Sequence, residues 1–560
     1  MRVGIIDALF DARPSRVSVL IAPTGYGKTS AVHYSWKEIL SKWGRVVHVF
    51  PLRALVSNVC SDAIERGFPV DLISYQAMLK EIEIEGYRIR KSPYMFSPYA
   101  ITTYDSFLTS IYVAPIAELS RVHAHRDTGL LAASGGVLLD EVHLALSVDK
   151  MDDIVGEWRK ILTSIVFTLE VLSFSMDRPT TLLTATLPRE ILQYIGSNLR
   201  KRGVEIVVHL CLGQRGLRYY NDAAQNIIRW GLDENYVSLY DKYNRISLTE
   251  VSKRKIEEDI IRALDWSQNI LVFCNTVHRA VEIYRKIKET VNIPVLLLHA
   301  RLAEKHKENI LKNIKELMNN KGNFILVSTQ CLEAGANFDF DTVVTEIAPP
   351  SSLIQRAGRA IRNLEKRLEH EDKRTQVIIN VSEDSIKSAN EVYPPEFIEA
   401  LFRRLNIGVY FIDWRFGEAE FSFIDLLATT PCNPEIDLKV LSQLKDLLKI
   451  SFIREETIKN ILRKLDDNMK GSLLRDGALI PLLVKDDIVA VSLKYLRNNK
   501  DILEFKNNNV VAILDNGEAL LNFEKLVQTP LSTLYELNRI GRFLGLKVKD
   551  DVYNPEVGLI

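Results

Sequence analysis

Short apolar runs alternate with amphipathic segments along the first part of the chain. The runs are VSVLIA, RVVHVF, AITT, GGVLLD and TTLLTAT. Continuous apolar runs of this length are typical of strands buried on both faces, and the amphipathic segments between them are typical of helices that cover a sheet. The pattern therefore predicts an α/β domain with a parallel sheet over residues 1–205.

The same alternation returns after a more polar connecting passage that begins at Arg218. The runs in this second part are NILVFCN, IPVLLLHA, NFILVST, DTVVTE and TQVIINV. They predict another parallel-sheet domain, which we place at residues 206–385. The sequence thus favours two α/β domains in tandem.

Beyond the second domain the pattern changes from alternating to helical. The segment PPEFIEALFRRL has helical periodicity, and we interpret residues 386–440 as a helical linker. The chain ends in β-like runs such as DDIVAVSLKYL and NNNVVAILDNGEAL. These runs predict a smaller accessory α+β domain over residues 441–560.

Composition adds little to this picture but sets limits on the partners. The 560 residues include 72 basic and 72 acidic side chains, so the formal net charge is zero. A chain of this length holds about three or four domains. Because no global positive charge is available, any nucleic-acid partner must be bound in a local cleft.

Nothing in the sequence indicates export or a membrane span. The longest apolar stretch begins at Ile161, is shorter than the ~20 residues that cross a bilayer and contains Glu170, so it predicts a buried helix. The N-terminal residues lack the apolar core of a signal peptide. Five widely separated cysteines without a C-x-x-C pair predict neither disulfides nor a zinc site. We therefore expect a cytoplasmic protein without a membrane partner.

The first candidate chemistry lies in LIAPTGYGKTSA, residues 20–31. In the pattern G-x-x-x-x-G-K-S/T, backbone N–H groups surround a diphosphate, the lysine reaches the β/γ-phosphates and the hydroxyl binds Mg²⁺. Ala22 replaces the first glycine of the pattern. An ordinary strand–turn–helix is the alternative reading. The candidate nucleotide-binding residues are Thr24, Gly25, Gly27, Lys28 and Thr29.

A second candidate follows the apolar run GGVLLD, where the sequence reads DEVH. A carboxylate at a strand end can hold Mg²⁺, and a neighbouring carboxylate can orient or deprotonate the water that attacks a γ-phosphate. We assign Asp140, together with Thr29, to the metal and Glu141 to the base. Two solvated carboxylates at a strand end are the alternative.

With both motifs in place, the chain resembles the superfamily 2 helicases, with DEVH as its D-E-x-D/H box. TATLP at 184–188 resembles the segment whose hydroxyls link His143 of the box to nucleic acid, while PLRAL at 51–55 and ITTYDSF at 101–107 resemble segments that touch a bound strand. Hydroxyl-rich turns suit phosphate contacts. The resemblance implies nucleic-acid contacts at Arg53, Thr102, Thr103, Thr184 and Thr186.

The resemblance continues through the second domain. LVFCNTVHRA, LLHARL and STQCLEAGANFDFD resemble family segments that contact nucleic acid or nucleotide. They imply strand contacts at Asn275, Arg301 and Thr329 and a nucleotide contact at Gly335.

The segment SLIQRAGRAIR, residues 352–362, is rich in arginine. Gln355, Arg356, Arg359 and Arg362 recur at intervals that suit one helical face. Guanidinium groups from a separate domain can stabilise charge on the γ-phosphate, so hydrolysis depends on closure of the cleft. We assign Gln355 and His143 to the catalytic set and Arg359 and Arg362 as arginine fingers. An exposed basic helix is the alternative.

For the fold, the resemblance implies two tandem RecA-like domains with ATP and Mg²⁺ between them, followed by the accessory domain. It implies an ATP-driven translocase that moves along single-stranded DNA. An RNA helicase, a DNA-repair helicase and a non-catalytic scaffold remain alternatives. The first glutamine of the chain is Gln76, so no upstream glutamine reads adenine as in some relatives.

Within superfamily 2 the chain is similar to the helicase of type I CRISPR interference, on DEVH, TATLP, LLHARL, EAGANFDFD and the near-terminal YNPEVGL. That family usually carries an HD nuclease, but here no histidine precedes an aspartate and the phosphate loop comes early. His123, His125 and Asp127 are the one metal-like group, and a surface pair is the competing reading. We expect a helicase-only form that works with a separate HD-type nuclease and an RNA-guided CRISPR surveillance complex.

Overall fold

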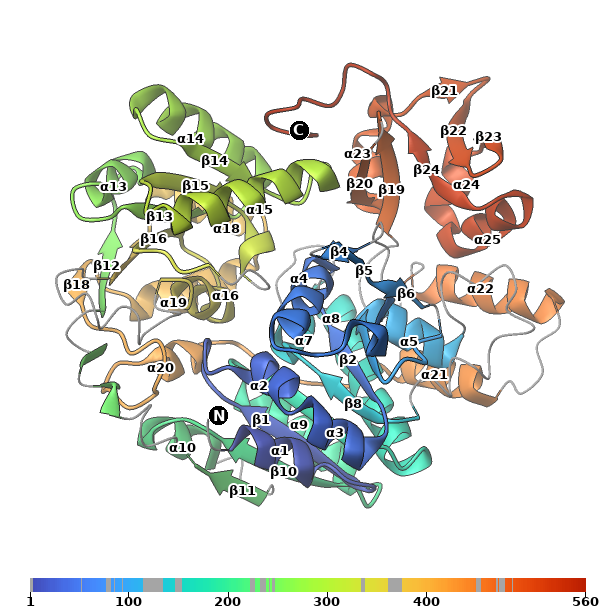
Figure 1. The fold of residues 1–560 in the computed structure, drawn as a ribbon, viewed down its shortest axis with the longest axis horizontal. Helices are drawn as coiled ribbons and strands as arrows, with labels where there is room; N and C mark the ends of the chain where they lie inside the picture. The colour runs from blue at the N-terminus through green and yellow to red at the C-terminus, as the bar shows by residue number, and fades with distance from the viewer. Residues whose placement is uncertain are drawn as a thin grey trace.

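Three β-sheets of six to nine strands organise the computed structural model of this protein (Figure 1). Two short strands, β4 (Glu83–Ile84) and β5 (Tyr87–Arg88), form a separate antiparallel pair. Helices pack against the two large sheets, and the third sheet lies near the C terminus. The structure describes residues 4–51, 53–76, 82–84, 86–92, 94–113, 134–146, 154–221, 227–231, 238–240, 242–243, 247–333, 338–360, 375–449, 455–469, 472, 479–485 and 487–559.

The first sheet has nine strands, and all their pairings are parallel. All five apolar runs predicted for this part are strands of the sheet, which confirms the α/β prediction. The sheet also continues beyond residue 205, through β10 and β11. In spatial order its strands are β11 (Ile227–Trp230), β10 (Glu205–Leu210), β1 (Arg16–Ile21), β9 (Thr180–Thr184), β8 (Gly136–Leu139), β2 (Val46–Phe50), β7 (Tyr99–Thr103), β3 (Ile73–Gln76) and β6 (Arg90–Lys91).

Helices follow most strands of this sheet, as expected for parallel pairings that need crossover connections. The apolar stretch from Ile161 lies in the buried helix that the sequence predicts, and it ends in a π-helical turn at Val171–Ser175. The helices are α1 (Ile5–Asp11), α2 (Lys28–Tyr34), α3 (Trp36–Trp43), α4 (Arg53–Glu65), α5 (Tyr104–Tyr112), α7 (Val142–Leu146), α8 (Ile154–Glu170), α9 (Arg189–Arg200) and α10 (Gln214–Asn221).

The second sheet has seven strands, six of them parallel to one another. The five predicted runs are again strands. An antiparallel edge strand, β18, pairs with β12 and lies in the segment expected to be a helical linker. In spatial order the strands are β14 (Val295–Leu298), β15 (Phe324–Ser328), β13 (Asn269–Phe273), β16 (Thr342–Glu346), β17 (Thr375–Asn380), β12 (Ser247–Ser252) and β18 (Gly408–Tyr410).

The helices of this second part pack against its sheet, and α16 and α20 lie toward the first part (Figure 1). The helices are α13 (Ile256–Ala263), α14 (Val277–Thr290), α15 (Glu304–Asn319), α16 (Pro350–Ala357), α18 (Glu383–Asn390), α19 (Pro395–Arg404) and α20 (Phe423–Leu427).

The C-terminal part combines two long helices with a small, mainly antiparallel sheet, as the predicted α+β accessory domain requires. The run DDIVAVSLKYL is half strand and half helix, because the hydroxyl of Ser492 accepts a hydrogen bond from the Tyr495 N–H and starts a helix. The elements are α21 (Leu438–Lys449), α22 (Glu455–Met469), β19 (Leu479–Val484), β20 (Asp487–Ser492), α23 (Leu493–Asn498), β21 (Phe505–Lys506), β22 (Asn509–Leu514), β23 (Gly517–Leu521), α24 (Phe523–Gln528), α25 (Pro530–Ile540) and β24 (Phe543–Lys547).

The last residues of the chain return to the second sheet and bind beside α14 and β14 (Figure 1). The Val557 carbonyl lies 3.1 Å from His299 Nε2, and the Ala303 N–H donates to the Tyr553 hydroxyl at 2.9 Å. Glu556 accepts from Tyr284 at 2.8 Å. The C-terminal tail thus ties the accessory part to the second domain. Within the described part of the chain, every helix falls short of the length and apolarity that a bilayer span requires.

Candidate nucleotide and nucleic-acid site

The phosphate loop connects the end of β1 to the start of α2. Gly25 and Gly27 have φ of 72° and 91°, a left-handed conformation that glycine adopts without steric cost. Lys28 is the first residue of α2, and its ammonium donates to the carbonyl oxygens of Ala22 at 3.0 Å and Pro23 at 3.2 Å. The lysine thus closes over the loop that the sequence assigns to phosphates.

Asp140 is fully buried at the end of β8 and binds the phosphate loop directly. Its carboxylate accepts from the Thr29 hydroxyl at 2.8 Å, from the Glu141 N–H at 2.8 Å and lies 3.2 Å from His48 Nε2. Burial raises the pKa of Asp140, but the hydrogen bonds from His48 and Thr29 and the charge of Lys28 outweigh burial and hold the pKa below its ordinary value.

Mg²⁺ fits this pair of residues. A hydroxyl and an ionised carboxylate 2.8 Å apart are the hard oxygen ligands that the ion prefers, and it usually takes only one or two of them from the protein. Thr29 and Asp140 therefore lie together where the sequence placed the metal. Among the described residues, no group of three or more His, Cys, Asp or Glu side chains is arranged to hold another metal ion.

Glu141 has a left-handed backbone conformation with φ of 49°. This conformation is costly for a residue with a side chain and is concentrated at functional sites. One of its carboxylate oxygens lies 3.5 Å from His143 Nδ1, and the side chain is 23% exposed. The predicted base is thus partly open to solvent, beside the buried Asp140.

His143 connects the two α/β domains. Its Nδ1 lies 3.1 Å from the Thr184 hydroxyl of the first domain, and its Nε2 lies 2.9 Å from the Gln355 amide nitrogen of the second. Burial lowers the pKa of His143 to about 3, so the ring is neutral near pH 7. Since the amide donates to Nε2, Nδ1 carries the hydrogen and donates to Thr184.

A second contact between the domains lies next to this one. A Cβ at Gly358, just after α16, would come within 2.5 Å of the Thr24 hydroxyl in the phosphate loop. The Thr24 hydroxyl is buried and has no hydrogen-bond partner among the described residues. Glycine is therefore required where the arginine-rich segment meets the phosphate loop.

The expectation that Gln355, Arg356, Arg359 and Arg362 share one helical face is wrong for the described part, because α16 ends at Ala357. Arg356 is fully buried and donates to Glu333 at 2.7 Å and to other groups of its own domain. Arg359 follows in a turn and donates to the Glu333 carbonyl at 2.6 Å. Arg356 therefore holds the second domain together, while Gln355 reaches the first.

The predicted strand contacts of the first domain are largely buried. Thr102 donates to the Gln76 carbonyl at 2.8 Å, and Thr103 caps the N terminus of α5. The hydroxyl of Thr186 is buried without a hydrogen-bond partner among the described residues. The Arg53 side chain lies outside the described residues. The nucleic-acid roles of these residues stay predictions.

The predicted strand contacts of the second domain lie in surroundings that differ from one residue to the next. Asn275 is buried and donates to the Ile347 carbonyl at 3.0 Å, and Thr329 is buried at the end of β15. The guanidinium of Arg301 lies 4.5 Å from the centre of the Tyr495 ring in the accessory part. Gly335, Arg362 and the metal-like group His123, His125 and Asp127 lie outside the described residues.

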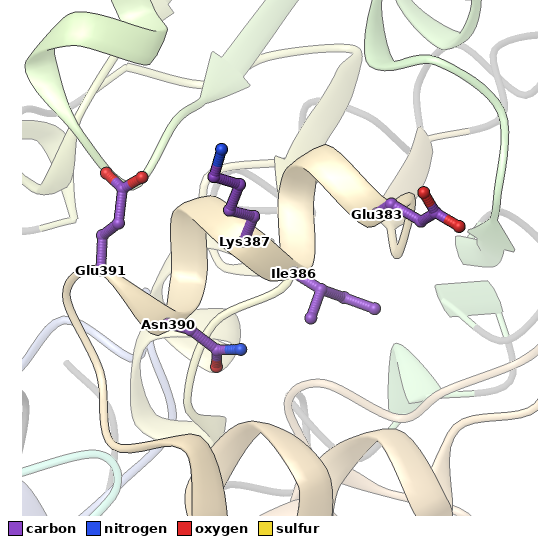
Figure 2. Close-up of a pocket in the computed structure, with 5 residues that line it drawn as sticks. All are labelled: Glu383, Ile386, Lys387, Asn390 and Glu391. Atoms are coloured by element: carbon purple, nitrogen blue, oxygen red, sulfur yellow. The ribbon is translucent and has the colours of Figure 1, made fainter.

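Two residues that the sequence analysis did not select support this site. His48 projects from the apolar run RVVHVF to Asp140, and Glu333 receives Arg356. A polar residue inside an otherwise apolar strand was the available signal for His48. A separate hollow runs along α18, lined by Glu383, Ile386, Lys387, Asn390 and Glu391 (Figure 2). None of the predicted site residues lines that hollow.

Two family models match the chain in the expected order. The DEAD/DEAH box helicase model matches residues 6–194, and the C-terminal model of the CRISPR-associated nuclease/helicase Cas3 matches residues 267–365. The chain is 26% identical over 392 residues to the CRISPR-associated nuclease/helicase Cas3 of Methanothermobacter thermautotrophicus, and 25% identical over 407 residues to the CRISPR-associated endonuclease/helicase Cas3 of Escherichia coli K12. This chain is therefore similar to the superfamily 2 helicases of the Cas3 type.

The two matches cover 68% and 64% of this chain but only 42% of each relative, so the chain spans less than half the length of these proteins. The crystal structure of T. fusca Cas3 superposes with a TM-score of 0.52 at 16% identity, covering 86% of this chain and 58% of that one. This likeness shows the shared fold. The predicted tandem RecA-like architecture is therefore confirmed. The DEAD/DEAH box helicase model over residues 6–194 agrees with the predicted class of ATP-dependent helicases.

The buried His143 makes the stability of the protein depend on pH. With a pKa of about 3 in the folded state and an ordinary value of 6.5, the unfolded chain takes up a proton that the folded chain does not. Stability is therefore complete above about pH 6.5 and decreases as the pH falls toward 3. We predict that the thermal midpoint of the wild type falls more steeply between about pH 7 and pH 5 than that of His143→Gln. Parallel pH dependences in the two proteins would contradict the buried neutral ring.

Proposed function

We propose that this chain is an ATP-driven translocase that moves along single-stranded DNA. The observation that carries the proposal is the contact between His143 and Gln355, 2.9 Å apart across the two domains. It joins the DEVH segment, which includes the buried Asp140, to the arginine-rich segment of the other domain. His143 also bonds to Thr184, which lies in a segment predicted to bind nucleic acid. Opening or closing of the cleft between the domains would therefore affect that segment.

ATP fits between the two domains with its phosphates on Lys28. When bound, Mg²⁺ neutralises charge on the β- and γ-phosphates, and Thr29 and Asp140 would hold it. Lys28 exchanges its loop carbonyls for phosphate oxygens. Glu141, partly exposed and beside the metal residues, orients and deprotonates the attacking water. Arg359 reaches the γ-phosphate from the second domain, which makes hydrolysis depend on domain closure.

The choice of DNA and of a CRISPR role rests on the relatives, which are named as CRISPR-associated nuclease/helicases. We propose that the chain is recruited in the cytoplasm by an RNA-guided surveillance complex and follows the strand that this complex displaces. Base pairing then reads the sequence, so the chain needs only contacts to the phosphate backbone, in keeping with its zero net charge. Its contact residues would be Arg53, Thr102, Thr103, Thr184, Thr186, Asn275, Arg301 and Thr329.

Substitution of the phosphate-loop lysine or of the base should abolish turnover without unfolding the protein. Lys28→Ala and Glu141→Gln each remove a contact that is stronger in the transition state, on the order of several kcal/mol. We expect ATP hydrolysis to fall at least about 100-fold in either variant. The assay measures phosphate release alone, with single-stranded DNA and with single-stranded RNA.

The exposed Lys37→Ala and Glu38→Gln on α3 are matched controls and should keep wild-type rates. Near-normal turnover in Lys28→Ala or Glu141→Gln would refute the assignment. Stimulation by RNA but not DNA would favour the RNA-helicase alternative, and absence of any hydrolysis in the wild type would favour a scaffold.

For Arg359, we expect substitution by alanine to preserve nucleotide binding and remove most of the turnover. Its guanidinium is 6% exposed and bound to a carbonyl of its own domain, so contact with the γ-phosphate forms only on closure. Binding of a fluorescent ATP analogue and steady-state hydrolysis separate the two effects. Equal losses of affinity and rate would contradict the finger role.

We further propose that this chain moves along DNA without cutting it and depends on a separate HD-type nuclease. None of the ten histidines precedes an aspartate in the sequence. The purified chain should leave single-stranded DNA intact with Mg²⁺, Mn²⁺, Co²⁺ or Ni²⁺. Degradation that survives both Lys28→Ala and repeated purification would refute this proposal and direct attention to His123, His125 and Asp127.

A further inference from the structure

Arg415 is a buried cation that the proposed mechanism does not use. Its side chain is 1% exposed, and its Nε and Nη2 atoms are buried without a hydrogen-bond partner among the described residues. Arg356 is equally buried but donates to Glu333, Thr345 and Asn275. Buried guanidinium nitrogens without an acceptor are costly, because they lose water and gain no hydrogen bond in return.

The loop that carries Arg415 bridges the two domains. On one side of it, the Trp414 indole donates to Thr249 of the second sheet at 2.9 Å. On the other side, the Phe416 carbonyl accepts from the Gly213 N–H at 2.6 Å, just after β10 of the first sheet. Arg415 thus stands between two residues that are each anchored to a different domain.

This position adjoins the phosphate loop. Cys211, at the end of β10, has Tyr26 of that loop as a hydrogen-bond partner and feels the charge of Lys28. Helix α20, which follows the Arg415 loop, packs against α10 and against α16 of the arginine-rich segment. The loop that carries Arg415 therefore joins elements that also pack against the phosphate loop and the arginine-rich segment.

The strand order indicates which end of the nucleotide lies nearest. The first sheet runs β10-β1-β9-β8, with the phosphate loop after β1 and Asp140 and Glu141 after β8. The γ-phosphate therefore points from the loop toward β8, and the rest of the nucleotide extends toward β10. Gly213, which binds the Arg415 loop, lies on this β10 side.

We propose that Arg415 binds the α-phosphate of the nucleotide. The inference rests on the proposed ATP site and adds a residue from the inter-domain loop to it. A guanidinium donates only, so its partner must be an acceptor, and the α-phosphate is the anionic acceptor at this end of the nucleotide. Because the loop is anchored to both domains, the same contact couples nucleotide binding to their relative position.

The test compares Arg415→Met and Arg415→Lys with the wild type in the full chain. We expect Arg415→Met to weaken binding of ATP, ADP and GTP alike by roughly 10- to 100-fold, since a hydrogen bond to a charged group is lost. Arg415→Lys keeps the charge without the planar guanidinium, so its nucleotide affinity should lie between those of the wild type and Arg415→Met. Arg215→Ala is the matched control, because it breaks a half-buried pair with Asp425 between α10 and α20 of the same interface.

Thermal midpoints separate a ligand role from a structural one. Without nucleotide, Arg415→Met should melt no lower than the wild type, because it removes an unpaired buried charge. With saturating nucleotide, the wild type should gain stability that the variant lacks. A lower midpoint of the nucleotide-free variant with unchanged affinity would overturn the proposal. A loss confined to ATP and ADP would overturn it as well and assign Arg415 to the base, and a loss confined to ATP and GTP would assign Arg415 to the γ-phosphate. If the wild type itself gains no stability with ATP, the proposed ATP site fails as well.

Discussion

The buried carboxylate of Asp140 is the interaction on which the rest of the site depends. It binds Thr29 of the phosphate loop and the N–H of Glu141, and it lies beside His48 in the neighbouring strand. A buried charge is stable only when its lone pairs are satisfied, so these groups must keep their places. The phosphate loop, the two residues proposed to hold the metal and the proposed base are thereby fixed relative to one another before any nucleotide binds.

Two domains are needed because one parallel sheet cannot supply all the groups that the proposed nucleotide site requires. Loops after its strands place a phosphate loop and carboxylates at one edge, but a cation that arrives only on closure must come from elsewhere. The second sheet presents α16 there, and Gln355 reaches His143 while Gly358 allows the backbone to approach Thr24. Arg356 holds α16 in place through bonds within its own domain.

Much of the fold could be predicted because strands buried on both faces are continuous apolar runs, and all ten runs are strands. The sequence analysis missed β18 because a three-residue edge strand has no continuous apolar run. It interpreted all of DDIVAVSLKYL as β-like, but Ser492 caps a helix there while the apolar residues continue. The motif residues could be found from residue type and spacing. The contact of His48 with Asp140 could not be found in this way, because it depends on which strands are neighbours in the sheet.

Arg415 shows where sequence reasoning ends. In the sequence it is one arginine among many, in a loop without a motif, and nothing local distinguishes it from Arg404 on the preceding helix. Its significance lies in two buried guanidinium nitrogens that lack an acceptor among the described residues. That is a property of the packed chain, since Trp414 and Phe416 must first be bound to different domains. A loop held in this way cannot follow one domain without straining its bonds to the other. If Arg415 binds the α-phosphate as proposed, the same side chain responds both to a nucleotide in the cleft and to the closure of the cleft around it.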